Sequence, residues 1–150
     1  ATGTLAGHAG VAETIAAVLR ALPHHLRRGQ VFLPADLLER HGTSAERMIA
    51  NPGDPATRAA VREFAEHGLH HLGRCRLYGD TVPAAASPAF LTLALVPPVL
   101  EGTAAAGYEP SASDLSGSRL RSLWRLWRAA RRMRAASDRG LVPVSAWLKG

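Results

Sequence analysis

Apolar positions along the chain recur every three or four residues, which is the period of a helix packed on a core. The first run predicts a helix from about Gly7 to Leu22, ending there because Pro23 disfavours helical geometry in the residue before it. The sequence shows no useful length of the apolar and polar alternation that is typical of strands. The pattern therefore predicts an all-α fold.

Two short helices are expected next, over residues 34–41 and 45–50. Pro34 suits the first turn of the earlier one, where its missing N–H costs nothing, and Gly42 ends it. Thr43 or Ser44 can cap the later one, and Thr43 and Glu46 have the spacing of a capping box.

Longer helices follow. Asp54 and Pro55 predict the start of a helix that extends to about residue 78. Ser87 begins another, which Pro97 and Pro98 should kink or break because neither proline has an N–H for the helical ladder.

With 150 residues the chain is long enough for one domain with a buried core. The net charge of +6 suits anionic partners such as diphosphate, acidic lipid, nucleic acid or an acidic protein surface. An equally weighted alternative is the preference of a GC-rich genome for arginine. One cysteine, Cys75, excludes a disulfide within this sequence, and no apolar run approaches the roughly 20 residues of a membrane span.

One stretch carries a recognisable motif. After a basic turn, the sequence reads Arg-Gly-Gln-Val-Phe-Leu-Pro-Ala-Asp-Leu from Arg28 to Leu37. It resembles the squalene/phytoene synthase family, in which Arg-Gly-x-hydrophobic-aromatic-Leu-Pro-x-Asp-Leu follows an aspartate-rich helix. The motif positions in this chain are Arg28, Gly29, Val31, Phe32, Leu33, Pro34 and Asp36.

The resemblance implies a fold class: the C-terminal half of an isoprenoid-synthase-type helical fold. Residues 1–136 would form the C-terminal part of a squalene/phytoene synthase-like domain, and residues 137–150 a loosely docked tail. The missing N-terminal half of the same fold would be the partner of this part. One face of the helices should therefore be apolar and open.

The resemblance also locates a missing metal motif. Family enzymes carry two aspartates, four residues apart on the helix before the turn, which hold magnesium and diphosphate. The aligned positions here are Ala21 and His25, with Pro23 expected to break the helix between them. Alanine offers no ligand, and histidine nitrogen is a poor ligand for magnesium. We therefore expect neither catalytic residues nor a cofactor, with magnesium needed only if the chain is an enzyme after all.

The sequence Ala-x-Pro-x-His at these positions resembles the branch of the family that contains the mitochondrial respiratory complex I assembly factor. That resemblance implies a pseudoenzyme, an assembly or interaction protein in the bacterial cytoplasm or at the inner face of the inner membrane. The alternative is a transferase of isoprenoid biosynthesis that condenses farnesyl or geranylgeranyl diphosphate. An intact aspartate-rich motif in the upstream half would favour this alternative.

Two basic clusters need separate interpretation. His67 and His71 lie four residues apart, a spacing that can hold zinc, but no third ligand is evident and we expect no metal site. Arg27 and Arg28 either contact an anion or membrane, or form a solvated basic turn at a helix end.

A final helix is expected over residues 118–136, and it is amphipathic and strongly basic. Its apolar stripe comprises Leu120, Leu123, Trp124 and Trp127. Its basic stripe comprises Arg121, Arg125, Arg128 and Arg132. Such a helix can lie on an anionic membrane or a membrane-protein partner, or it can pack its tryptophans on the core and leave its arginines solvated. No nucleic-acid partner is expected, since no recognised binding module surrounds the arginines.

Overall fold

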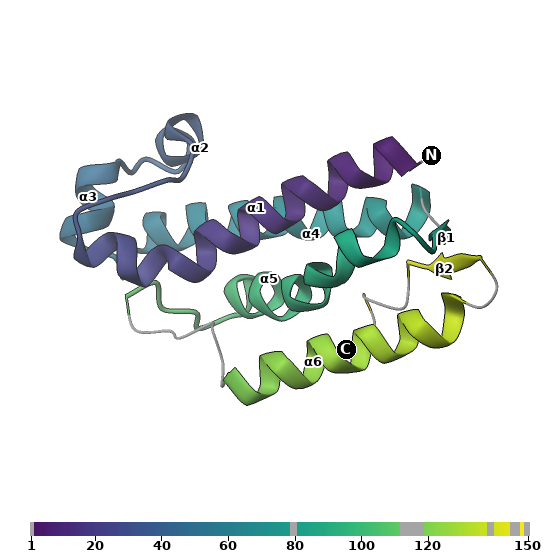
Figure 1. Ribbon diagram of the computed structural model, residues 1–150. Helices are drawn as coiled ribbons and strands as arrows, with labels where there is room; N and C mark the ends of the chain where they lie inside the picture. Colours follow the sequence, from purple (N-terminus) through teal and green to yellow (C-terminus); the bar gives the residue numbers. More distant parts are fainter. Residues whose placement is uncertain (1, 79–80, 112–118, 138–139, 145–147, 149–150) are drawn as a thin grey trace.

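The computed structural model describes residues 2–78, 81–111, 119–137, 140–144 and 148 of the chain (Figure 1). Helices dominate this part of the chain, so the expected all-α class is confirmed. The elements in order are α1 (Thr2–Arg27), α2 (Ala35–Arg40), α3 (Ala45–Ala50), α4 (Pro55–Tyr78), β1 (Thr81–Pro83), the 3-10 helix η1 (Ser87–Leu95), α5 (Val96–Ala104), α6 (Arg119–Ser137) and β2 (Leu141–Pro143).

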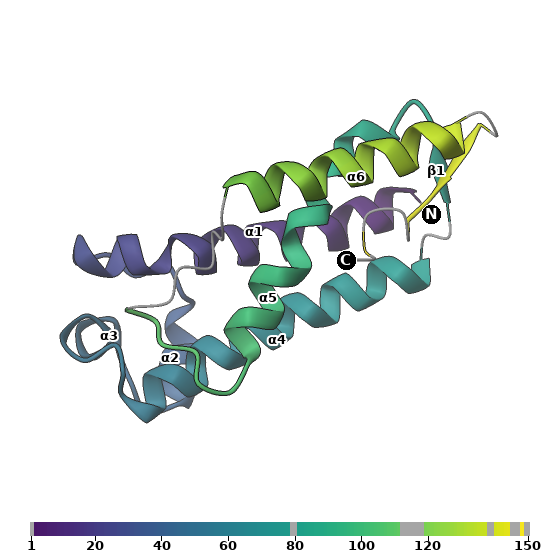
Figure 2. The same ribbon diagram turned by 90° about the horizontal axis from the view of Figure 1, so that it is seen from below.

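The two longest helices, α1 and α4, lie antiparallel and side by side (Figures 1 and 2). The N-terminal end of α1 meets the C-terminal end of α4, where the Cys75 Sγ lies 4.0 Å from the Leu5 carbonyl oxygen. Helix α5 packs on both, and η1 separates this layer from α6. The short helices α2 and α3 cover one end of the pair, and the two-stranded β1–β2 sheet lies at the other.

Helix α1 does not end at Leu22 as predicted, but continues through Pro23 to Arg27. Leu22 and Leu26, on either side of the proline, are both buried. Burial of each leucine side chain contributes about 1.5–3 kcal/mol. The two together offset the cost of about 3 kcal/mol that a proline imposes inside a helix through its missing N–H and its clash with the preceding turn. The apolar periodicity therefore outweighs the proline. The helix ends where Gly29, with a φ of 66°, donates its N–H to the Leu26 carbonyl.

The caps of α3 and α4 follow the sequence in part. Asp54 caps α4 as predicted, since its Oδ2 accepts hydrogen bonds from the first backbone N–H groups of that helix. Of the two predicted cap residues of α3, Ser44 is confirmed, since its Oγ accepts a hydrogen bond from the Arg47 N–H. The predicted capping box between Thr43 and Glu46 is therefore wrong. The Thr43 side chain is instead buried, with its Oγ1 3.3 Å from that of Thr57 in the first turn of α4.

Pro97 and Pro98 mark a change of helix type, not a kink in one helix. Residues Ser87–Leu95 form the 3-10 helix η1, and the chain becomes α-helical at Val96. Both prolines then lie in the first turn of α5, where backbone N–H groups have no partner within the helix and proline loses nothing. The expected break is thus confirmed at its place, with the prolines beginning the second helix.

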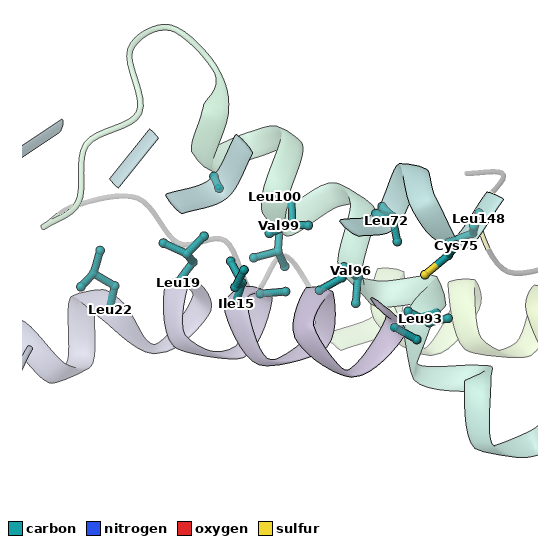
Figure 3. Close-up of a cluster of buried hydrophobic side chains, with 14 of the residues drawn as sticks. Ile15, Leu19, Leu22, Leu72, Cys75, Leu93, Val96, Val99, Leu100 and Leu148 are labelled. Carbon is teal, nitrogen blue, oxygen red and sulfur yellow. The ribbon is translucent and has the colours of Figure 1, made fainter. Parts of the chain in front are cut away.

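The core lies where α1, α4 and α5 meet (Figure 3). Side chains from all three helices are buried there, with further contributions from η1 and from Leu148 near the end of the chain. The labelled members are Ile15, Leu19, Leu22, Leu72, Cys75, Leu93, Val96, Val99, Leu100 and Leu148. Cys75 is a buried free thiol within this cluster.

The tail expected to be loosely docked is instead held where the structure describes it. β2 pairs antiparallel with β1, with Val82 opposite Val142, and both valines are fully buried. Val144 and Leu148 are also buried. Three-residue strands are too short to show an alternation of apolar and polar residues, so this pairing could not be predicted from the sequence. Where the domain boundary falls stays a prediction.

By length and composition, the segment Gly3–Arg27 of α1 is long and apolar enough to cross a membrane. The expectation that no run approaches that size is therefore wrong. In the fold, however, one side of α1 packs against α4 and α5 and buries its leucines there. This is the environment of a core helix.

We predict that Gly68→Ala destabilises the protein although alanine favours helix. A Cβ at Gly68 would lie 2.9 Å from Leu100 Cδ2 and 3.0 Å from Ile15 Cγ2 in the packed core. Overpacking costs about 1–3 kcal/mol and the gain in helix propensity is about 1 kcal/mol. The free energy of unfolding, measured by urea denaturation, should fall by up to about 2 kcal/mol.

The matched control is Gly73→Ala in the same helix, where a Cβ would meet nothing within 4 Å. This variant should be more stable than the wild type by about 0.5–1 kcal/mol. Equal effects of the two substitutions would show that α1 and α5 do not approach α4 closely at Gly68.

Candidate functional site

The aligned metal-motif positions, Ala21 and His25, lie in the last turns of α1. Because α1 is continuous through Pro23, these positions face the same side of one helix, which corrects the expectation of a break between them. Both side chains are half-buried. The two positions therefore form an i, i+4 pair on one helix face, occupied by a methyl group and an imidazole.

His25 is held by aromatic packing. Its ring lies 4.6 Å from that of Phe32 in an edge-on arrangement. Its Nδ1 is buried and has no hydrogen-bond partner among the described residues. The backbone carbonyl of His25 accepts hydrogen bonds from the N–H groups of Arg28 and Gln30, which close the helix end. His25 thus packs where a family enzyme would place a metal ligand.

The remaining family motif builds the connection between α1 and α2. Gly29 supplies the left-handed turn, Leu33 is buried under it, and Pro34 directly precedes the first residue of α2. Phe32 is 54% exposed, and Asp36 in the first turn of α2 is exposed as well. The half-buried Val31 packs against the core. Arg27 and Arg28 are exposed beside this turn, so the structure leaves them accessible to an anion.

An open groove of about 840 Å³ lies between α1, α2 and α4. Its walls are largely apolar and include Val11 and Ile15 of α1, Leu37 of α2 and Phe64 of α4. This is the open apolar face that the sequence predicted.

The groove and the metal-motif positions occupy one side of α1. Gly7, which lines the groove, and His25 are 18 residues apart, which is five turns of an ideal helix. The same face therefore runs from the groove to the degenerate motif, although neither Ala21 nor His25 lines the groove itself.

The charged residues of the groove lie on its α2 and α4 sides, where Glu63 is already paired. Glu63 of α4 contacts His41 Nε2 at 2.6 Å and Arg40 at 3.0 Å. Asp36, Glu66 and His67 also line the groove. In the part of the chain that the structure describes, no three His, Cys, Asp or Glu residues could together hold a metal ion. The Glu63 pairing ties α2 to α4 and is a structural contact.

Four histidines cluster where the first turns of α1 meet α4. His71 Nδ1 lies 2.9 Å from His8 Nδ1, so at least one of the two rings must be neutral to accept that hydrogen bond. The His67 and His70 rings lie 4.8 and 5.9 Å from the His71 ring. Burial first, and then the neighbouring His67, His8, His70 and Arg74, lower the pKa of His71 below its ordinary value of 6.5.

The apolar stripe of α6 points into solvent. Leu120 is 78% exposed, Leu123 61%, Trp124 51% and Trp127 55%. The alternative in which the tryptophans pack on the core is therefore wrong. The residues that α6 buries are Ala129 and Met133, on the side that faces η1 and β2.

The basic stripe flanks the exposed apolar stripe. Arg121 is exposed, whereas Arg125, Arg128 and Arg132 are half-buried. The Arg128 guanidinium lies 5.1 Å from the Trp124 ring centre, and that of Arg131 lies 4.9 Å from the Trp127 ring centre. Arg131 and Arg134, both exposed, continue the tryptophan face along the helix.

Sequence reasoning missed His8 and the Glu63 cluster. The i, i+4 spacing singled out His67 and His71, but His8 joins them only because α1 packs antiparallel on α4. The partners of Glu63 come from α2 for the same reason. The helix pairing that unites these groups is a tertiary feature, and no local signal in one sequence reports it.

The histidine cluster predicts a specific loss of stability in mild acid. Because the pKa of His71 is lowered in the folded state, the unfolded chain binds more protons below about pH 6.5. The free energy of unfolding should then fall as the pH drops from 6.5 towards the lower folded-state pKa. Urea denaturation at about pH 7.5 and about pH 5.5 should show this loss.

His71→Gln removes the titrating ring and should make this pH dependence shallower, whatever it does to stability at neutral pH. His24→Gln, which replaces an exposed histidine of the same helix as His8, is the matched control and should keep the wild-type dependence. An unchanged pH dependence in His71→Gln would refute the assignment.

The squalene/phytoene synthase family model matches residues 1–128. The relative named NADH dehydrogenase (ubiquinone) complex I, assembly factor 6, from Mus musculus is 42% identical over 86 residues, which are 57% of this chain and 26% of the relative. The protein of the same name from Homo sapiens is 40% identical over the same shares of both chains. The Dictyostelium discoideum homolog is 28% identical over 64% of this chain and 27% of its own.

The matched part thus spans about a quarter of the length of these relatives. No solved structure matches the chain. The resemblance to the branch of the complex I assembly factor, stated from the Ala-x-Pro-x-His sequence, is confirmed. The family match covers well over half of the chain, and the helical fold agrees with it. The chain therefore belongs to the squalene/phytoene synthase family.

Proposed function

We propose that this protein is a non-catalytic member of its family that assists the assembly of respiratory complex I. The observation that carries the proposal is the pair Ala21 and His25. The helix that would present two metal-binding aspartates is continuous and correctly phased, yet it presents a methyl group and an imidazole packed on Phe32. The names of the relatives support the assembly role.

The acids of the groove do not replace the missing pair. Magnesium needs oxygen ligands in near-octahedral order and is usually bound by carboxylates together with substrate phosphates. Glu63 is engaged by Arg40 and His41, and Asp36 lies on another helix from Glu66. A prenyl diphosphate would find an apolar groove here without the ions that hold its charged end.

The proposed site of action is the surface of a membrane, because the complex named in the relatives is a membrane-protein complex. We infer a protein of the bacterial cytoplasm that works in peripheral contact with the inner face of the inner membrane. A membrane surface or a membrane-protein subunit is then its partner.

The open groove has a proposed role within the fold. In the family, the preceding helices complete the isoprenoid-synthase-type fold. The groove between α1, α2 and α4 is apolar and about 840 Å³ in volume, which suits the packing of such helices. We propose that the N-terminal half of the fold covers it.

The alternative, a prenyl-diphosphate transferase, rests on the retained Arg28–Leu37 motif and the apolar groove. An enzyme assay separates this alternative from the non-catalytic proposal. The full-length protein, incubated with magnesium and farnesyl or geranylgeranyl diphosphate, should release no pyrophosphate above background, because the second metal motif is absent. An active phytoene synthase under the same conditions is the control. Formation of a C30 or C40 hydrocarbon at an enzyme-like rate would contradict the proposal.

A genetic experiment tests the assembly role directly. Deleting the gene in the source organism should lower membrane NADH dehydrogenase activity and the amount of mature complex I on native gels. Asp36→Asn should restore both as well as the wild type does, because Asp36 is an exposed residue and a non-catalytic protein needs no acid there. Normal complex I in the deletion strain would refute the assembly role, and loss of rescue by Asp36→Asn would favour an enzyme.

A further inference from the structure

Helix α6 is the outermost layer of the fold. In Figure 1 it lies at the lower edge of the molecule, with η1 and α5 between it and α1. It contacts η1 and β2 on one side, where Ala129 and Met133 are buried. Its opposite side carries the exposed leucines and tryptophans described above, so an apolar stripe lies at the most prominent edge of the protein.

The charge on α6 has a single sign. Between Arg119 and Ser137 the helix has seven arginines and no acidic residue. Two of them, Arg128 and Arg131, lie over the exposed faces of Trp124 and Trp127. The aliphatic parts of such side chains extend the apolar surface, while their guanidinium groups are presented around it.

We propose that this side of α6 binds anionic phospholipid bilayers, with Trp124 and Trp127 at the depth of the headgroups and the surrounding arginines on lipid phosphates. Tryptophan favours the membrane interface because its ring is apolar and its N–H finds polar partners there. A helix that is apolar on one face and basic around it lies in the plane of the interface. Arginine makes two parallel hydrogen bonds to a phosphate, a geometry that lysine cannot provide.

The observations favour lipid over an acidic protein surface. A protein partner selects particular residues through shape, with an anchor side chain in a pocket, and it usually meets both signs of charge at the rim. The exposed face of α6 is instead a narrow stripe with arginine only. A bilayer with anionic lipid is flat, uniformly negative and apolar below its headgroups, which matches a straight helix at the edge of the fold.

This inference rests on the proposed function for its biological setting, since that function acts at a membrane-protein complex. Its test does not. Binding to protein-free vesicles is independent of complex I, so a failed vesicle experiment leaves the genetic test intact, and failure of the genetic test leaves vesicle binding intact.

The experiment uses the whole chain and two kinds of vesicle, phosphatidylcholine alone and phosphatidylcholine mixed with phosphatidylglycerol. The chain should sediment with the mixed vesicles only, and added salt should weaken binding because the arginine contribution is electrostatic. Brominated phosphatidylcholine in the mixed vesicles should quench the tryptophan fluorescence if the rings enter the interface. Binding without quenching would overturn the proposed depth.

Variants of α6 then test whether its exposed side is the surface that binds the vesicles. Arg128→Gln with Arg131→Gln should lower vesicle affinity about tenfold to a hundredfold, given the contribution of each arginine near an anionic surface. Trp124→Ala with Trp127→Ala should lower sedimentation comparably. Both pairs are on the surface, and circular dichroism should show unchanged helicity.

Two matched controls remove the same side-chain types elsewhere. Leu77→Ala removes an apolar side chain that is 75% exposed on α4, and Arg62→Gln removes an exposed arginine of that helix. Both should bind like the wild type. Absence of vesicle binding, including the case in which the chain sediments only with protein-containing cell membranes, would overturn the proposal, as would α6 variants that bind no worse than the controls.

Discussion

The fold depends on the close approach of α1 and α5 to α4 at Gly68. The position of a Cβ there would be 3.0 Å or less from side-chain carbons of Leu100 and Ile15, so glycine lets the three helices meet at this distance without displacing those side chains. The core of Figure 3 extends in both directions from this contact. The same contact sets how α1 is rotated about its own axis. That rotation determines which residues line the groove, where the histidines meet and which side the motif positions face.

Helices and caps, which depend on neighbouring residues, could be predicted from the sequence. Contacts that the pairing of helices creates could not. Helical periodicity located α2, α3 and α4 closely, and Asp54 marked the start of α4 because a cap acts within one turn. The prediction that α1 ends at Leu22 was wrong because it considered the local effect of Pro23 and not the burial of Leu26 beyond it. The β1–β2 pair joins segments about sixty residues apart through strands of three residues, and so short a pairing leaves no pattern.

The candidate site was predicted by motif and corrected by geometry. The aligned positions Ala21 and His25 were identified from the residues that follow them, and the structure keeps them on one continuous helix face. At these positions the helix carries a methyl group and an imidazole, while its leucines on the other side pack into the core.

The two notable surfaces lie on opposite sides of the α1–α4 pair. Figures 1 and 2 both place α2, which borders the groove, on one side and α6 on the other. A chain bound to a bilayer through α6 would therefore turn its groove away from the lipid. Helices that cover the groove could then pack there without meeting the membrane. In the two proposals, the apolar surface of the groove serves folding and the apolar surface of α6 serves membrane binding. Arginine distinguishes the two surfaces, since the groove residues include one, Arg40, whereas α6 carries seven.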